Sequence, residues 1–127
     1  MAALTIAALA NDTVTTKSGL KYNDIVTGNG VEAVLDKIVT VHLVMWADIN
    51  GAKGEKLFDS YENGFGSVSF RLGTKRFPDG LSIGIKGMRV GGKRRLYIPS
   101  DLNPKTTSGK FPGNADLIYE VELLDVK

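Results

Sequence analysis

One run of nine residues limits the fold more than any other part of the sequence. Residues 38–46 read Ile-Val-Thr-Val-His-Leu-Val-Met-Trp, rich in β-branched and aromatic types and free of glycine and proline. Such a run favours a strand, because branched and aromatic side chains fit the pleated surface of a sheet. We therefore predict a central β-strand over these residues.

Further strand-like runs follow, separated by glycine-rich breaks. They cover residues 20–26, 56–60, 68–72, 94–99 and 117–126, with loops predicted at 50–54 and 100–116. Leu81, Ile85 and Met88 recur at helical spacing after Pro78-Asp79, which predicts one short helix although Gly84 lowers its propensity. The pattern predicts an α+β fold, a five- or six-stranded antiparallel β-sheet curled around one short α-helix.

Composition narrows the chemistry that this fold can carry. The 127 residues suit one domain, and a net charge of +2 is too small for a broad phosphate-binding surface, so we expect no nucleic-acid partner. The chain has no cysteine and a single histidine, His42, which excludes disulfides, thiolate zinc sites and paired-histidine metal sites. We expect a function without metal, cofactor or covalent chemistry.

The N-terminus is apolar and uncharged over its first ten residues. This is roughly half of the ~20 residues that span a bilayer, so no membrane span is predicted. Ala8-Leu9-Ala10 has the small-x-small pattern that signal peptidases accept, which favours a targeting-peptide remnant with a mature start near Asn11. A meaningless alanine-rich terminus is the alternative. We predict a flexible segment over residues 1–15 and the folded domain over 16–127.

Three stretches of the sequence resemble the FK506-binding-protein (FKBP) type of peptidyl-prolyl cis-trans isomerase. They are residues 18–22, Phe58-Asp59-Ser60 and residues 87–99, and residues 115–126 are similar as well. The resemblance covers the chain from about Thr16 onward. It implies a sheet curled around one helix, with a hydrophobic cleft between them that acts on proline-containing polypeptide clients.

Carried over position by position, the resemblance implies that Phe58, Asp59 and Tyr119 are the catalytic residues. The other cleft positions depart from the usual family pattern. Leu43 stands where the family usually has a tyrosine, Val68 where it has another aromatic residue, and Leu81 where it has the tryptophan at the start of the helix. Phe77-Pro78 stands in place of a valine-isoleucine pair. The tyrosine of the family's final loop is missing here, and Phe111 is a candidate to replace it. The arginine that usually pairs with the aspartate falls at Gly64.

For several of these residues a purely structural interpretation stays open. Phe58 and Tyr119 would also fit ordinary core packing, and Asp59 an exposed turn. His42 has no acid or serine near it in sequence, so we interpret it as a hydrogen-bonded sheet residue without a catalytic role. We interpret residues 93–95, Lys-Arg-Arg, as part of a solvated hairpin, and Trp46 as a packing or contact residue.

Two functions remain open at this point. The first is a slow prolyl isomerase that assists protein folding, because a cleft with fewer aromatic side chains should hold proline weakly. The second is a binding module without catalysis, such as an assembly factor or a subunit of a larger complex. The N-terminal pattern and the absence of cysteine suit an exported compartment, with the chloroplast thylakoid lumen suspected and the periplasm or cytoplasm as alternatives.

Overall fold

A computed structural model describes residues 13–62, 66–74, 79–102 and 115–127. The strands are β1 (Val14–Thr15), β2 (Lys21–Val26), β3 (Ile38–Ile49), β4 (Ala52–Asp59), β5 (Val68–Arg71), β6 (Lys93–Ile98) and β7 (Leu117–Val126). Helix α2 (Asp79–Ile85) and the 3-10 helix η1 (Ser100–Leu102) complete the described elements.

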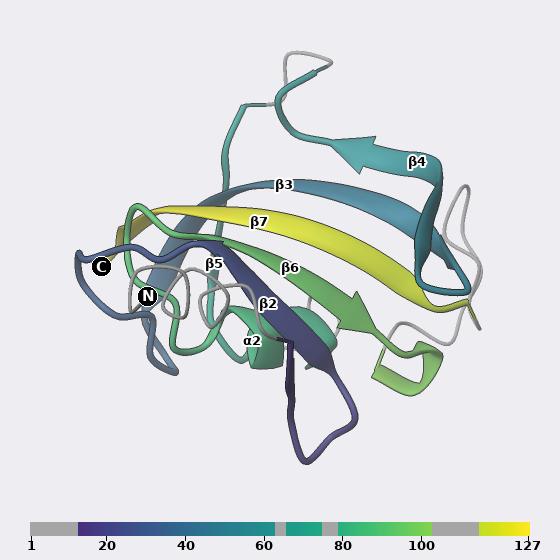
Figure 1. The fold of residues 1–127 in the computed structure, drawn as a ribbon. Helices are drawn as coiled ribbons and strands as arrows, with labels where there is room; N and C mark the ends of the chain where they lie inside the picture. The colour runs from purple at the N-terminus through teal and green to yellow at the C-terminus, as the bar shows by residue number, and fades with distance from the viewer. Residues whose placement is uncertain (1–12, 63–65, 75–78, 103–114) are drawn as a thin grey trace, which may run out of the picture.

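The strands form one antiparallel sheet that arches over α2 (Figure 1). Their order is β1-β2-β6-β7-β3-β4, and β5 also pairs with β3. The predicted class, an antiparallel sheet with one short α-helix, is therefore confirmed for the described residues, although the sheet has seven strands where we predicted five or six. β3 is the central strand that residues 38–46 predicted, and it continues to Ile49.

The loop predicted at residues 50–54 is wrong for most of its length. β3 and β4 are joined only by Asn50 and Gly51, whose φ angles are 54° and 89°. Positive φ at both central residues is what a tight two-residue hairpin turn requires, and Asn-Gly adopts it at low cost. The long hairpin carries β4 alongside β3 and brings Phe58 opposite Met45.

At its other edge the sheet includes β1, which pairs with β2. Val14 and Thr15 therefore belong to the sheet, which differs from the predicted flexible segment over residues 1–15. Residues 1–12 of that segment lie outside the described residues. None of the helices in the described ranges combines the length and hydropathy needed to cross a membrane.

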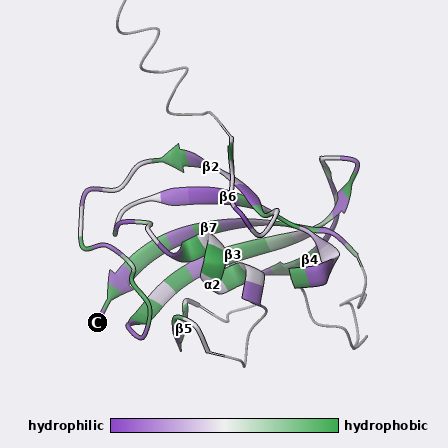
Figure 2. Ribbon diagram, turned by 90° about the horizontal axis from the view of Figure 1, so that it is seen from below, coloured by the Kyte–Doolittle hydropathy of each residue, from purple (hydrophilic) through white to green (hydrophobic). Residues whose placement is uncertain are grey.

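The hydrophobic core lies between α2 and the face of the sheet that the helix covers. Alternate residues of β3 and β7 turn toward this face, which Figure 2 shows as hydrophobic bands along both strands. Leu81, Ile85 and Met88 meet them from the helix side, as the helical spacing predicted. The strand residues of this set are Val39, Val41, Leu43, Met45, Leu117, Tyr119, Val121 and Leu123.

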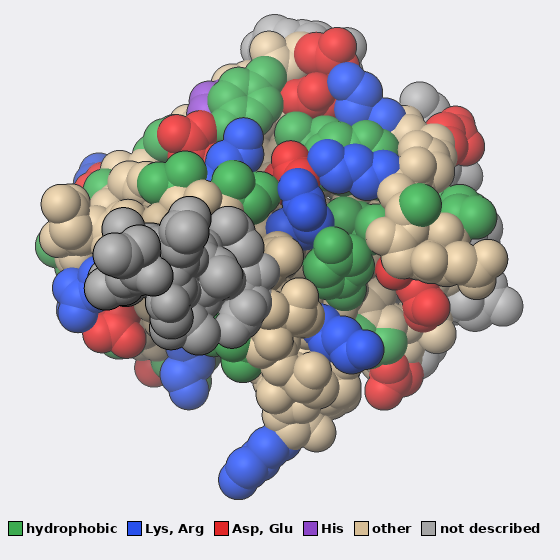
Figure 3. Space-filling view, viewed as in Figure 1, with side chains coloured by type: hydrophobic (Ala, Val, Ile, Leu, Met, Phe, Trp, Pro, Cys, Tyr) green, Lys and Arg blue, Asp and Glu red, His purple; other side chains and the backbone are tan. Residues whose placement is uncertain are grey.

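The opposite face of the sheet is ionic and aromatic. Glu120 accepts bonds from Lys53 at 2.7 Å and Arg95 at 2.9 Å, and the Lys53 ammonium lies 4.1 Å from the Trp46 ring centroid. Figure 3 shows the mixture of acidic, basic and hydrophobic side chains on this side. Trp46 therefore packs on the outer face of the sheet. The interpretation of residues 93–95 as solvated is wrong for Arg94, because β6 alternates and buries this side chain on the helix side.

Candidate active site

Two of the three residues predicted to be catalytic, Phe58 and Tyr119, lie in one cross-strand row. Met45 on β3 lies opposite Phe58 on β4 and, on its other side, opposite Tyr119 on β7. Tyr119 in turn lies opposite Leu96 on β6, so the row crosses four strands. Met45 was not predicted as a site residue. Its position two residues after Leu43 in an alternating strand was the signal that would have found it.

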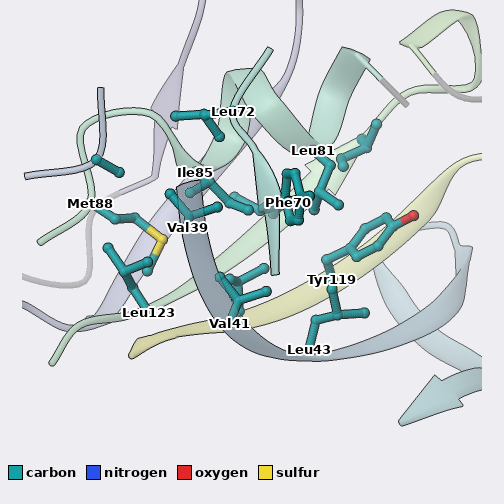
Figure 4. Close-up of a cluster of buried hydrophobic side chains, with 14 of the residues drawn as sticks. Val39, Val41, Leu43, Phe70, Leu72, Leu81, Ile85, Met88, Tyr119 and Leu123 are labelled. Carbon is teal, nitrogen blue, oxygen red and sulfur yellow. The ribbon is translucent and has the colours of Figure 1, made fainter. Parts of the chain in front are cut away.

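Residues from two further elements, α2 and β5, join this row in one apolar cluster. Leu43, Leu81 and Tyr119 belong to one buried cluster, and Phe58 and Val68 pack against it. Figure 4 shows Leu81 and Tyr119 within the cluster, with the Tyr119 hydroxyl directed away from its centre. The apolar positions predicted for the cleft therefore come together wherever the structure describes them. Phe77, Pro78 and Phe111 lie outside the described residues.

Phe70 is an aromatic member of the same cluster that sequence reasoning missed. It stands on β5 two residues after Val68, on the same side of the strand, and is buried with Leu81. The clean alternation of residues 68–72 placed both side chains on one face, but only the fold shows that this face meets the helix. Phe70 therefore adds one aromatic ring to a cluster in which leucine stands at two positions where the resemblance implies aromatic rings.

Tyr119 is held as a neutral phenol by its surroundings. The residue is 3% exposed, and this burial raises the pKa of the phenol because the charged form loses its hydration. The group therefore keeps its proton throughout the neutral range. Its contribution to a site is an apolar ring with one polar end, which suits gripping an apolar ligand while fixing its orientation.

Asp59 follows Phe58 at the end of β4, and its carboxylate is engaged on both oxygens. One oxygen accepts a bond from the Lys56 ammonium at 2.9 Å, and the other from the backbone N–H of Tyr61 at 2.9 Å. Burial by itself raises the pKa of this carboxyl, but the bonds from Lys56 and the Tyr61 amide outweigh it, so the pKa lies below its ordinary value. Asp59 is therefore ionised at neutral pH.

Lys56 supplies the cation that the sequence did not reveal. The position where the resemblance implies an arginine is Gly64, which lies outside the described residues. The Lys56 ammonium, in contrast, bridges Asp59 at 2.9 Å and Glu62 at 2.7 Å. On a regular strand, side chains three residues apart point to opposite faces, so the sequence does not predict a contact between Lys56 and Asp59. The contact arises because the register of β3 and β4 shifts between Trp46 and Met45.

Ser60 continues the pairing of β3 and β4 past the end of the ladder. Its backbone N–H donates to the Leu43 carbonyl at 2.9 Å, and its hydroxyl accepts from the Leu43 N–H at 2.9 Å. The same hydroxyl lies 2.8 Å from Nδ1 of His42. His42 is therefore a hydrogen-bonded sheet residue, as expected, and Ser60 is buried too deeply to serve as a nucleophile.

A second contact fixes the turn that follows Ser60. The Tyr61 ring stacks on His42 with centroids 4.1 Å apart and 20° between the planes, and its hydroxyl donates to Glu122 on β7. Burial and the bond to Glu122 raise the pKa of Tyr61, so this donor also keeps its proton. Ser60 and Tyr61 thus fasten the residues after Phe58 and Asp59 to two strands of the sheet.

The arrangement is a largely buried apolar cluster, with the ionised Asp59 next to Phe58 at the end of β4. Within the described residues no three histidine, cysteine, aspartate or glutamate side chains gather in a way that could hold a metal ion. An apolar cluster of this kind suits contact with an apolar ring.

Comparison with known proteins identifies relatives of this chain. The model of the family described as FKBP-type peptidyl-prolyl cis-trans isomerase matches residues 30–124. An FK506-binding protein of Neisseria meningitidis serogroup B is 40% identical over 110 residues, which cover 85% of this chain and 96% of that protein. The chloroplastic peptidyl-prolyl cis-trans isomerase FKBP16-4 of Arabidopsis thaliana is 35% identical over 127 residues, covering 92% of this chain and 52% of that protein.

A solved structure shows the same fold over nearly the whole chain. The crystal structure of FkpA from Escherichia coli matches with a TM-score of 0.78 and 30% sequence identity, covering 98% of this chain and 57% of that one. The resemblance carried by residues 18–22, 58–60 and 87–99 is therefore confirmed at the level of sequence and of fold. The chain belongs to the FKBP-type peptidyl-prolyl cis-trans isomerase family.

Proposed function

We propose that this protein is a slow peptidyl-prolyl cis-trans isomerase that binds proline-containing segments of client polypeptides in a cleft between α2 and the sheet. One observation carries the proposal: Phe58, Met45 and Tyr119 form a continuous row in the same apolar cluster as Leu81. Family membership, and relatives named as peptidyl-prolyl cis-trans isomerases, support the reaction.

An apolar surface is sufficient for this reaction without a nucleophile. The barrier to turning an X-Pro bond is ~18–20 kcal/mol and comes from amide resonance, which is lost when the bond twists. The planar amide is more polar than the twisted one, so a dry apolar site favours the transition state over the ground state. Every ~1.4 kcal/mol gained in this way accelerates rotation about tenfold.

The reduced rate follows from two leucines in this surface. Leu43 and Leu81 occupy positions where the family resemblance expects aromatic rings, and an aromatic side chain buries ~150–250 Å². A smaller side chain offers a prolyl ring less contact and leaves more room for water. Phe70, buried in the same cluster, replaces part of that apolar area.

A protease-coupled assay on a chromogenic X-Pro peptide tests the proposal. We expect Tyr119→Leu to lower kcat/KM about tenfold, since losing roughly 60 Å² of ring contact at roughly 25 cal/mol per Å² removes about 1.5 kcal/mol. The matched control is Tyr97→Leu, the same change on the outer face of β6. A wild-type protein that does not exceed the uncatalysed rate would contradict the enzymatic function.

The alternative function is a binding module that keeps the fold and has lost catalysis. The leucines at positions 43 and 81 are the observation that favours it. Calorimetric titration with the same peptide separates the two functions. A module binds the peptide without accelerating its isomerisation, and Tyr119→Leu then weakens binding alone.

We also propose that the protein acts in an exported compartment, with the chloroplast thylakoid lumen preferred. The relative named chloroplastic and the Ala8-Leu9-Ala10 pattern support this location. Mass-spectrometric mapping of protein from its native source should find a chain that begins near Asn11. An intact segment from Leu4 to Ala10 in the mature protein would contradict export by this signal.

A further inference from the structure

The position of α2 depends on an unusually close approach to β6. Gly80 and Gly84, four residues apart on one face of the helix, have no side chains to separate it from the strand. A Cβ atom built on Gly80 would lie 2.4 Å from Cγ2 of Ile98, and one on Gly84 would lie 2.5 Å from Cδ1 of Leu96. Side chains of β6 therefore press directly on the backbone of the helix.

Arg94 stands on the same face of β6, two residues before Leu96, and reaches the C-terminal end of α2. Its Nη1 donates to the carbonyl oxygens of Gly84 at 3.0 Å and Lys86 at 3.3 Å. The last carbonyls of a helix lack partners within the helix, and a cation near them is favoured by the helix dipole. Arg94 thus satisfies two carbonyls where α2 ends.

The other side of the same guanidinium is fixed to β2. Nε of Arg94 donates to Asp24 at 2.7 Å and Nη2 donates to the second Asp24 oxygen at 3.3 Å. The Tyr22 ring lies beneath, with its centroid 4.0 Å from Cζ of Arg94. The arginine residue is 6% exposed, so one buried cation connects β2, β6 and α2.

We infer that Arg94 is a positioning residue for the predicted cleft: it holds the end of α2 at a fixed height above β6 and thereby fixes Leu81. The helix has only seven residues, about two turns, so a shift at Gly84 is transmitted to Leu81 three residues earlier. Leu81 is 2% exposed within the cluster that includes Tyr119. For catalysis, this inference rests on the proposed isomerase function.

Arginine is needed for this role because its donors point in several fixed directions. A guanidinium presents a planar fork that serves a carboxylate on one side and carbonyls on another, whereas a lysine ammonium concentrates its three donors on one atom. A lysine side chain at this position would retain the charge but could not hold Asp24 and both carbonyls together. Arg94→Lys therefore separates the geometry of the contact from its charge.

The experiment compares R94K with R95K, the same substitution at the next residue. Arg95 faces the outer side of the sheet and bonds to Glu120 at 2.9 Å, away from α2. Two quantities are measured: the methyl resonances of Leu81 by NMR, and kcat/KM in the protease-coupled assay. We expect R94K to shift the Leu81 methyls and to lower kcat/KM about tenfold, less than the roughly hundredfold that a misplacement of about 1 Å can cost. R95K should change neither.

Tyr22→Leu gives a milder second test if R94K does not fold. It removes only the ring beneath the guanidinium and should shift the Leu81 methyls in the same way but less. Unshifted Leu81 methyls in folded R94K, or in Y22L where R94K is unfolded, would overturn the inference, as would equal shifts in R95K. A wild-type protein without isomerase activity would contradict the proposed function, and the methyl resonances would still decide the role of Arg94.

Discussion

Gly84→Ala should destabilise the protein, although glycine within a helix is normally improved by alanine. Replacing a helical glycine gains about 1 kcal/mol of helix propensity. Here the new Cβ would meet Leu96 at 2.5 Å from Cδ1, 2.8 Å from Cδ2 and 3.1 Å from Cγ. Carbon atoms prefer to be about 3.5–4.0 Å apart. Because Leu96 is 0% exposed, it has no space to swing into, and α2 must rise.

The expected net effect is a loss of about 2 kcal/mol in the free energy of unfolding, from an overpacking cost of about 3 less the propensity gain of about 1. Urea denaturation measures it. A double-mutant cycle with Leu96→Ala isolates the cause, because removal of the clashing atoms should turn Gly84→Ala into a gain of about 1 kcal/mol. If the substitution stabilises the wild type, or costs the same in both backgrounds, the close approach of α2 to β6 does not determine its effect.

Three further predictions concern the candidate site. Leu43→Tyr combined with Leu81→Trp should raise kcat/KM in the protease-coupled assay by restoring ring contact, and a folded double variant with an unchanged rate would show that these positions do not contact the prolyl ring. Lys56→Met should raise the lowered pKa of Asp59 toward its ordinary value, measured by carbon-detected NMR titration. The stabilisation from this ion pair is present above the unfolded pKa of about 3.9 and disappears as the pH falls through the lower folded pKa. The free energies of unfolding of wild type and variant should therefore converge in acid. A pKa that does not move would contradict the assignment of Lys56. Ser60→Ala should cost about 1–3 kcal/mol in urea denaturation, since it leaves the buried Leu43 N–H without a partner, and a change under about 0.5 kcal/mol would refute that reasoning.

The elements that sequence reasoning predicted well are those with strong local periodicity. The run from Ile38 to Trp46 identified the central strand, and the spacing of Leu81, Ile85 and Met88 identified the helix. The Asn50-Gly51 turn was missed although its signal is local, because the polar residues around it were interpreted as one loop. That error hid the length of the β3–β4 hairpin, which places Phe58 opposite Met45.

The site itself could not be derived from local patterns. Phe58 and Tyr119 are 61 residues apart in sequence and lie on the two sides of Met45 only because β3 lies between β4 and β7 in the sheet. Strand order of this kind is non-local, so only the family resemblance supplied it in advance. The contact between Lys56 and Asp59 needs, in addition, a shift in strand register that depends on packing.

Arg94 shows why charge is a poor guide to exposure in this chain. A run of three basic residues suggests a solvated surface, but β6 is a strand covered on one face, and alternation turns its middle residue inward. Burial of that cation is tolerated because Asp24 neutralises it and two helix carbonyls complete its hydrogen bonds. Asp24 lies 70 residues before Arg94 in the sequence, so the two form an ion pair only because β2 and β6 are adjacent in the sheet.

The two glycines and the arginine bear on how the proposed cleft would be shaped with fewer aromatic side chains. In a cleft lined by large aromatic side chains, the packing of those rings determines how deep the cleft is. Here Leu81 is smaller, and the height of α2 is determined instead by backbone contact with Leu96 and Ile98 and by the bond network of Arg94. Substitutions that enlarge Leu81, such as Leu81→Trp, should therefore cost stability by overpacking, separately from the ring contact that they restore. The rate of this protein should consequently respond to changes in the helix-facing residues of β6, such as Arg94, as strongly as to changes in the residues proposed to contact proline.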